Sequence, residues 1–279
     1  MITERSLAVR APLNAPVLLH FLDVHAVAGV EAVEGETYRV ALRLRHGPGH
    51  AEVQLGMDTV RLRLDVADPA DTADAIDRMR HLLDLDADPA VIDTALAAIP
   101  QLRPLVRRRP GLRAPGAVDG FELAAGTIVG QQVSLAGART VLRHLVAGYG
   151  EPVGDGWWQF PSPETIAALD PEVLPMPQAR GRALIGLARA VADGGLCLAL
   201  DADSKGTEAA LLRLPGVGPW TARYVRMRVC KDPDVLLDGD LAVRRTLDRL
   251  GMTAADAANC APWRSYLSHH LWAEFLATR

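Results

Sequence analysis

Two glycines, Gly216 and Gly218, lie in the segment LPGVGP between predicted helices over 205–214 and 220–230. Glycines on either side of one apolar residue, here Val217, permit a tight turn whose peptide N–H groups face outwards. Because the turn leads into a helix N-terminus, these N–H groups can bind an anion such as a phosphate. The segment can equally be a plain turn between two helices that binds nothing. A turn that binds phosphate through its backbone requires little net positive charge.

An aspartate, Asp240, follows Gly218 by 22 residues and opens an amphipathic segment over 241–251. Its simplest role is that of a helix N-cap, worth about 1 kcal/mol. A glycine turn followed by an aspartate at this distance is much less common than either feature alone. The combination therefore favours a functional site that contains both.

The elements predicted around these residues divide the chain into two parts. In the first part, apolar and polar residues alternate as in half-buried antiparallel strands, and two further segments have helical spacing. The predicted strands are 6–12, 37–46, 51–56 and 59–68, and the predicted helices are 15–27 and 68–84. This part carries no catalytic pattern.

From about residue 88 onwards helix follows helix, without strand-like alternation. The predicted helices are 89–99, 121–150, 163–171, 178–193, 205–214, 220–230, 241–251 and 263–278, and a basic stretch over 107–120 is the one loose connector. The pattern predicts an α+β protein. Its first domain, over 1–88, is a small antiparallel sheet with helices, and its second, over 89–279, is an all-α core.

The charge of the chain differs between its two parts. The whole sequence of 279 residues has 30 Lys and Arg against 34 Asp and Glu, a net charge of −4, which alone argues mildly against a nucleic-acid partner. Residues 1–95 carry a net −7, however, whereas residues 96–279 carry a net +3. Two parts of opposite sign suggest two domains with different roles. An apolar content of 49% excludes wholesale disorder.

Three cysteines lie far apart in the sequence, at Cys197, Cys230 and Cys260, and predict neither a disulfide framework nor a cysteine metal site. No signal peptide or membrane span is expected, so we predict a soluble, cytoplasmic protein without membrane association. Adjacent histidines, His269 and His270, face different sides of a helix and do not predict a metal site.

Three motifs resemble those of the helix-hairpin-helix DNA glycosylases. They are LPGVGPWTA at 214–222, VLLDGD at 235–240 and GTIVGQQVS at 126–134. PWRSYLSHHLW at 262–272 resembles the AlkA branch, 3-methyladenine-DNA glycosylase II, and segments in the same order extend the similarity over nearly the whole chain. The resemblance implies a helix-hairpin-helix at about 207–230 in the second domain, and it suits a strand-rich first domain.

The resemblance implies that Asp240 is the catalytic carboxylate. A carboxylate can stabilise the positively charged sugar that forms when a base leaves, and it can align or deprotonate water. Asp238 is the rival position, and we expect it to be a turn or cap residue. Relatives that also cut the strand have a lysine two residues after the second glycine, where this chain has Trp220. A glycosylase without lyase activity is therefore expected, and the lack of four clustered cysteines argues against an iron–sulfur cluster.

Three aromatic residues, Trp220, Tyr224 and Trp272, match the base pocket of the AlkA type. Trp220 and Tyr224 are four residues apart and share one helix face. Electron-rich rings attract a cationic flipped base, which predicts broad specificity for alkylated purines. The alternative is that aromatic residues belong to the core, which we expect for Trp157, Trp158 and Trp263, and Tyr224 could be either.

The remaining implied contacts are with DNA and with a cation. Gly216, Val217, Gly218 and Thr221 would contact the DNA backbone, and Gln132 would fill the gap that the flipped base leaves. The AlkA prototype has an apolar leucine at that position, and Gln132 could instead be a solvated helix residue. The backbone carbonyls of Leu212, Leu214 and Val217 would hold a monovalent cation, sodium or potassium, while catalysis needs no cofactor. The basic residues of RMRVCK at 226–231, with Arg244 and Arg245, could contact phosphates or simply be solvated.

These inferences predict a monomeric enzyme that acts on double-stranded DNA with damaged bases, near the nucleoid of a bacterium. It would excise alkylated purines of the 3-methyladenine and 7-methylguanine type and leave an abasic site. Two alternatives stay open. One is a glycosylase for another lesion, such as hypoxanthine or an oxidised base. The other is a non-catalytic protein that binds damaged DNA.

Overall fold

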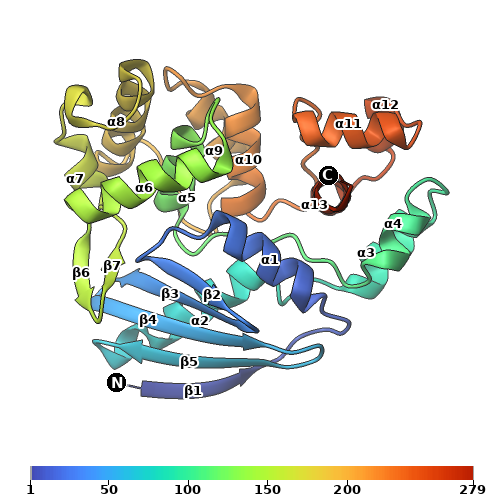
Figure 1. Cartoon of the computed structure of the whole chain (residues 1–279), viewed down its shortest axis with the longest axis horizontal. Helices are drawn as coiled ribbons and strands as arrows, with labels where there is room; N and C mark the ends of the chain where they lie inside the picture. Colours follow the sequence, from blue (N-terminus) through green and yellow to red (C-terminus); the bar gives the residue numbers. More distant parts are fainter. Residues whose placement is uncertain (1, 279) are drawn as a thin grey trace.

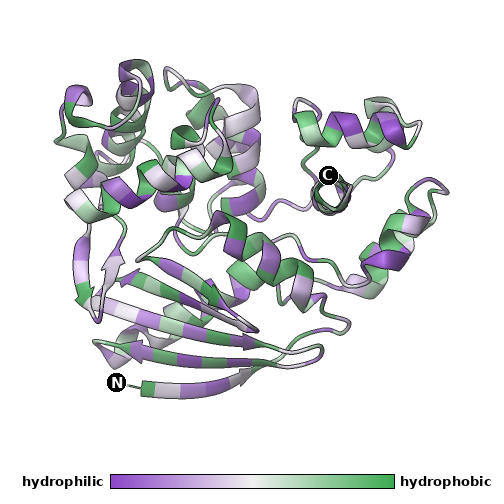
Figure 2. Ribbon diagram, viewed as in Figure 1, coloured by the Kyte–Doolittle hydropathy of each residue, from purple (hydrophilic) through white to green (hydrophobic). Residues whose placement is uncertain are grey.

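The computed structural model describes residues 2–278 and combines an N-terminal sheet with a larger helical part (Figure 1). Five antiparallel strands form the sheet in the order β1-β5-β4-β3-β2. Their bounds are β1 (Ile2–Leu7), β2 (Glu31–Glu34), β3 (Thr37–Leu44), β4 (Gly47–Leu55) and β5 (Val60–Val66). β5 shows why the sequence forms a sheet, because buried and exposed residues alternate along its whole length. Hydrophobic and hydrophilic residues alternate in the same way along the strand (Figure 2).

Two helices accompany the sheet, α1 (Ala15–His25) and α2 (Thr72–Leu83). They bury apolar residues in one core with the strands, including Leu18 and Leu22 of α1 and Met79 of α2. Asn14 caps α1, because its side chain accepts a hydrogen bond from the Val17 N–H, and a proline lies in the first turn. α1 lies between the sheet and the helical part in Figure 1, so the face of α1 turned away from the sheet is directed toward the helical part.

The helical part runs from residue 89 to the end of the described chain. Its helices are α3 (Pro89–Ala97), α4 (Arg103–Arg108), α5 (Gly120–Val129), α6 (Leu135–Tyr149), α7 (Pro163–Ala167), α8 (Gln178–Ala192), α9 (Ser204–Leu212), α10 (Pro219–Val229), α11 (Leu241–Arg249), α12 (Ala254–Ala258) and α13 (Arg264–Ala277). Single turns of 3-10 helix occur at Pro69–Asp71 and Pro171–Val173. The predicted α+β fold is confirmed. Among residues 2–278, no helix is both long and apolar enough to cross a membrane.

Two hydrophobic cores divide the helical part, and α10 contributes to both. Val225 and Val229 belong to a core with α5, α6 and α8, whereas Tyr224 and Met227 belong to a core with α3, α4, α11 and α13. Since different faces of α10 pack into the two cores, this helix lies at the junction between them. The residues in its first turns are therefore held firmly on both sides.

Several expectations about the strands are wrong. A short hairpin of β6 (Glu151–Gly154) and β7 (Trp157–Gln159) interrupts the helical part and touches the sheet, where Gln159 donates to the Leu42 carbonyl. The first strand is 2–7 rather than 6–12, and β2 had no predicted counterpart. Strands of three or four residues show too little alternation to be recognised in a sequence.

The long helix predicted over 121–150 is two helices. A turn over 130–134 separates α5 from α6, and Gln132 adopts a left-handed backbone conformation with φ of 56°. Ser134 ends the turn, because its side chain accepts a hydrogen bond from Gly137 N–H and caps α6. The break places exposed side chains at the edge of the site described below.

The basic stretch over 107–120 is not a loose connector. Leu112 and the residues up to Val118 are buried, and so is the Arg113 guanidinium. Arg113 donates to the carbonyls of Ala87 and Pro12, at 3.0 and 3.2 Å. The guanidinium N–H groups of Arg113 thus satisfy backbone carbonyls of the surrounding segments. The stretch is part of the protein interior between the sheet and the helical part.

Candidate active site

Asp240 lies at the N-terminus of α11 with both carboxylate oxygens engaged. Oδ1 accepts hydrogen bonds from the Ala242 and Val243 N–H groups, at 2.9 and 3.0 Å, as an N-cap does. The same oxygen accepts from the Trp272 indole at 3.1 Å, and Oδ2 accepts from the Trp220 indole at 3.2 Å. Two indole donors from different helices therefore fix the plane of the carboxylate, which the capping role alone would not require.

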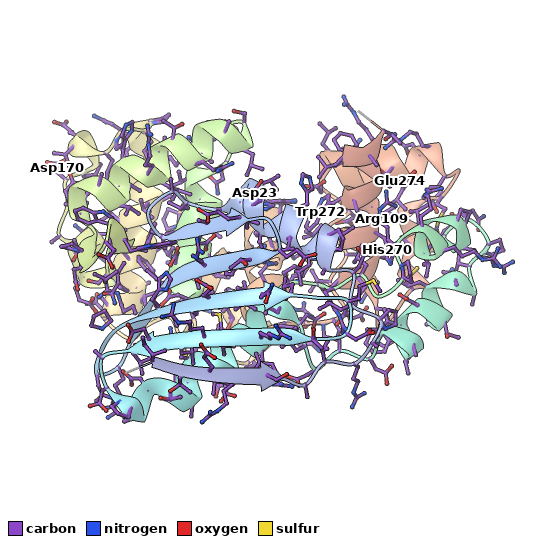
Figure 3. All side chains as sticks on the ribbon, turned by 60° about the horizontal axis from the view of Figure 1, so that its bottom comes forward. Asp23, Arg109, Asp170, His270, Trp272 and Glu274 are labelled. Carbon is purple, nitrogen blue, oxygen red and sulfur yellow. The ribbon has the colours of Figure 1, made fainter. Side chains whose placement is uncertain are left out.

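The three predicted aromatic residues lie together beside this carboxylate. Trp220 and Tyr224 stack with ring planes 6° apart and centroids 5.2 Å apart, and Trp272 meets Tyr224 edge-on at 6.1 Å. Tyr224 is only 8% exposed, so it is both a core residue and part of the site. Figure 3 labels Trp272 on α13 near Arg109 and Glu274, whose ion pair of 2.9 Å ties α13 to the end of α4.

A cavity of about 430 Å³ opens between these residues and α1. Asp240, the three aromatic residues and Leu135 line it from the helical part, and the N-terminal domain supplies Phe21 and His25. The lining is mostly apolar with a few polar groups, and the volume is within the range of about 300–1,000 Å³ for small-molecule pockets. A flat aromatic base could enter with its sugar near Asp240.

Phe21 and His25 were not predicted as site residues. They lie one turn apart on α1, and their rings are in contact at 4.3 Å between centroids. Phe21 also meets His269 of α13 edge-on at 5.2 Å. The only signal in the sequence was their helical spacing. It indicated a buried face but not that this face would contact α10 and α13.

A buried arginine, Arg228, lies behind the aromatic rings. Its guanidinium carbon is 4.7 Å from the Phe21 centroid and 5.5 Å from the Tyr224 centroid. It donates to the Tyr224 hydroxyl at 2.6 Å and to the Pro115 and Gly116 carbonyls at 2.6 and 2.7 Å. Arg228 therefore orients the pocket rings. It does not face solvent, so the idea that it contacts phosphate is wrong.

A second cavity, of about 320 Å³, shares a wall with the first. Phe21, His25, Trp220 and Tyr224 line both. Its far end contains two carboxyl groups, Glu31 and Glu122, beside Tyr38. Burial raises the pKa of Glu31 to about 7, and burial together with the nearby Glu31 raises the pKa of Glu122. The pair therefore retains protons well above the usual range for carboxyl groups.

The glycine hairpin joins α9 to α10 as predicted. Gly216 has φ of 86°, which favours glycine, and Val217 is buried between the helices. No side chain caps α10, and no acceptor among residues 2–278 bonds the peptide N–H of Gly216, Gly218 or Trp220. Free N–H groups at a helix N-terminus are what an anion such as phosphate requires. Thr221 is buried rather than exposed.

The turn over 130–134 lies against this hairpin. Gln131 donates from Nε2 to the Gly216 carbonyl at 3.0 Å and to the Thr221 hydroxyl at 3.1 Å. Gln132 is exposed, and so are the next apolar side chains, Val133 at 42% and Leu135 at 45%. Exposed apolar residues at the mouth of a pocket are suited to contact with bases.

The three carbonyls predicted to hold a cation differ in their partners. Leu214 accepts a hydrogen bond from the Val217 N–H at 3.1 Å, which leaves one lone pair. No donor in the described chain bonds the Leu212 or Val217 carbonyl oxygen. Carbonyl oxygens without a protein donor fit the oxygen ligands that a hard monovalent cation prefers.

Several other candidates lie outside the site. Asp238 is exposed and pairs with Arg223 at 2.9 Å. Arg226 pairs with Glu208 and Asp232, at 2.7 and 2.6 Å, so it faces other side chains rather than solvent. Trp157, Trp158 and Trp263 are only partly buried, so the expectation that they are core residues is met in part. Arg244 and Arg245 are exposed, and their contact with phosphate stays a prediction.

Comparison with known proteins gives relatives whose names agree with one another. The AlkA N-terminal domain family model matches residues 4–119. The chain is 34% identical over 272 residues to "DNA-3-methyladenine glycosylase 2" of Escherichia coli, with 94% of each chain covered. It is 41% identical over 276 residues to the Mycobacterium tuberculosis "Probable bifunctional transcriptional activator/DNA repair enzyme AlkA", covering 95% of this chain but 56% of that one. The chain thus spans little more than half of this longer relative.

A solved structure shares the fold over nearly the whole length. The 3-methyladenine DNA-glycosylase from Archaeoglobus fulgidus superposes with a TM-score of 0.84, and 98% of each chain is covered. Only 18% of residues are identical, so this likeness supports the fold alone. It includes the N-terminal sheet as well as the helical part.

Proposed function

Because the chain belongs to the family of AlkA-type DNA-3-methyladenine glycosylases, we propose that it is a monofunctional DNA glycosylase that removes alkylated purines from double-stranded DNA. The observation that carries the proposal is Asp240, held by two indole N–H groups at an aromatic cavity beside the glycine hairpin. The names of the relatives give 3-methyladenine as a substrate of those proteins. Purines with a methyl group at N3 or N7 are the class that the cavity suits.

The chemistry follows from the charges. A base alkylated at a ring nitrogen is cationic and leaves readily, so the bond from the sugar to the base breaks without prior protonation. The positive charge then resides on the sugar, where the Asp240 carboxylate stabilises it. Water adds to the sugar and gives its proton to Asp240 or to solvent, which leaves an abasic site. A single carboxylate suffices, unlike the paired acids of most glycosidases.

The aromatic rings supply recognition. Trp220, Tyr224 and Trp272 present electron-rich surfaces, and each face-on contact with a cationic base contributes about 0.5–2 kcal/mol. Selection by charge rather than shape implies a broad range of alkylated purines. Position 220 holds an indole where a Schiff-base mechanism requires an amine, so strand cleavage is not expected.

The hairpin and the turn over 130–134 would hold the DNA. The free N–H groups of Gly216 and Gly218 would bind a backbone phosphate, and Gln132 with its exposed apolar neighbours would fill the gap in the helix. Leu212, Leu214 and Val217 would hold a monovalent cation, which supplies positive charge near that phosphate. We propose that the protein does this as a monomer, which light scattering at micromolar concentration would test.

The function is tested by incubating methylated genomic DNA with the protein and identifying the released bases by liquid chromatography. The wild type should release 3-methyladenine and 7-methylguanine. Asp240→Asn should release them at least about a hundredfold more slowly while still binding lesion duplexes. Asp238→Asn, which alters a neighbouring exposed carboxylate, serves as the matched control and should remain active. Equal release by Asp240→Asn and wild type would contradict the mechanism.

A further inference from the structure

One histidine in the base cavity has a fixed tautomer. His25 lies in the last turn of α1, and its Nδ1 is 2.7 Å from the Phe21 carbonyl oxygen. A carbonyl can only accept, so Nδ1 carries a proton and donates. In the neutral ring the other nitrogen, Nε2, then has a lone pair and no proton.

The surroundings of His25 keep the ring neutral. Burial and the positive charge of Arg228 lower its pKa to about 4. This net value includes smaller lowering contributions from Arg139 and His20 and the opposing effect of the Phe21 carbonyl, which raises the pKa. At neutral pH the ring therefore presents an acceptor rather than a positive charge that would repel a cationic base.

The Nε2 atom is free to meet a ligand. No donor within residues 2–278 bonds Nε2, and the protein does not enclose this atom completely. The ring lines both cavities, on the wall formed with Phe21, Trp220 and Tyr224. The nearby His269, by contrast, has its Nε2 enclosed without access. His25 thus provides an accessible, neutral acceptor among aromatic surfaces.

We propose that His25 is a specificity-determining residue whose Nε2 accepts a hydrogen bond from an N–H group on the edge of the flipped purine. The inference rests on the proposed function and extends it, because the stacked rings select by charge whereas this acceptor selects by edge chemistry. Purines with a donor edge are favoured: the adenine type through its exocyclic amine, and the guanine and hypoxanthine types through N1–H. A buried acceptor discriminates because a base without a donor leaves it unsatisfied.

The experiment compares two neutral bases that differ in their donors. Duplexes contain either 2′-deoxyinosine, which has N1–H, or 2′-deoxynebularine, which has no N–H on its ring edge. Single-turnover release of each base is measured for the wild type, His25→Phe and His25→Gln. His25→Phe keeps an aromatic ring but removes the acceptor, and His25→Gln restores an acceptor oxygen. His144→Phe alters an exposed histidine of α6 away from the cavities and is the matched control.

The ratio of the inosine rate to the nebularine rate is the readout. His25→Phe should lower this ratio about fivefold, the size expected for one neutral hydrogen bond, and His25→Gln should recover part of it. His144→Phe should leave it unchanged. A ratio in His25→Phe equal to that of the wild type overturns the role of His25 even if the enzyme is active. If the wild type releases no base from methylated DNA either, the proposed function itself fails, which is a different result.

Discussion

Asp240 performs two tasks with one side chain, because its Oδ1 caps α11 while the carboxylate as a whole faces the cavity. Asparagine retains an oxygen that can cap a helix, whereas alanine does not. Asp240→Ala is therefore expected to lose about 1 kcal/mol of unfolding free energy in urea titrations, and Asp240→Asn much less, although both lose activity. Equal stability of the two variants would show that the cap contributes nothing.

The two indole donors allow a second test at the level of single residues. Trp272→Phe keeps an aromatic ring but removes the N–H that reaches Asp240 at 3.1 Å. A hydrogen bond to a charged group contributes about 1.5–3 kcal/mol, so single-turnover base release should slow at least about tenfold. Trp263→Phe, at a partly buried tryptophan outside the cavity, is the control. Unchanged release in Trp272→Phe would mean that Trp220 and the backbone alone orient the carboxylate.

The sequence predicted the site residues that belong to a local motif. The hairpin, Asp240 and the three aromatic residues all lie where they were expected. Phe21 and His25 were not predicted because their place in the cavity arises only from the packing of α1 against α10 and α13, a long-range contact without a local motif. The same applies to Arg228, which reads as an exposed basic residue until the structure shows the carbonyls that it satisfies.

At the scale of elements, the hairpin glycines are not equivalent. A Cβ on Gly216 would meet the Ala183 Cβ at 2.7 Å, and φ is 86° there, whereas a Cβ on Gly218 would meet no atom within 4 Å. Gly216→Ala should therefore lower the unfolding free energy by about 1–2 kcal/mol. Gly218→Ala should keep wild-type stability but weaken DNA binding, because the methyl group lies at the surface that would approach a phosphate. Thermal denaturation and fluorescence anisotropy measure the two effects.

The two variants can contradict the role of the hairpin. If Gly218→Ala binds duplex DNA as tightly as the wild type, this backbone does not approach a phosphate. If Gly216→Ala is as stable as the wild type, α8 yields to the extra methyl group.

Element boundaries were predicted well where glycine, proline or a cap residue ends a long helix. The failures have different physical causes. Between α5 and α6 the turn is local, because the Ser134 cap and the left-handed Gln132 create it, and the helical spacing on both sides of it concealed the break. The hairpin of β6 and β7 is stabilised by contact with the sheet rather than by its own sequence.

At the scale of the whole molecule, the buried pair of Glu31 and Glu122 makes stability depend on pH. In the unfolded chain a glutamate titrates near pH 4.5, but in the folded protein the pKa of Glu31 is about 7. Between these values the folded state holds a proton that the unfolded state has lost, so the unfolding free energy falls as pH rises. Glu31→Gln should be about 3 kcal/mol more stable than the wild type at pH 8 but not at pH 4, as urea titrations can measure.

The exposed Glu36 on the adjacent turn provides the control, because Glu36→Gln should leave the pH dependence as it is. An identical pH dependence in Glu31→Gln and the wild type would show that the pair ionises freely.

The distribution of charge makes a further prediction for the whole chain. The net charge is −4, and the hairpin would bind phosphate through backbone groups rather than lysines. Few counterions are then released on binding, so the logarithm of the affinity for undamaged duplex should fall with the logarithm of salt concentration with a slope of about −3 to −4. Anisotropy titrations at several salt concentrations measure it. A slope of about −8 would indicate many direct contacts from side chains to phosphates.

Helix α1 comes from the N-terminal domain, yet it forms one wall of the cavity that faces Asp240. Under the proposed function, the part of base recognition that Phe21 and His25 would supply therefore resides on a different part of the polypeptide from the carboxylate that would cleave the bond. Substitutions on the inner face of α1 could alter which bases fit without disturbing the carboxylate, the indoles that hold it or the hairpin. Such a division would let lesion preference change without a change in the residues proposed for hydrolysis.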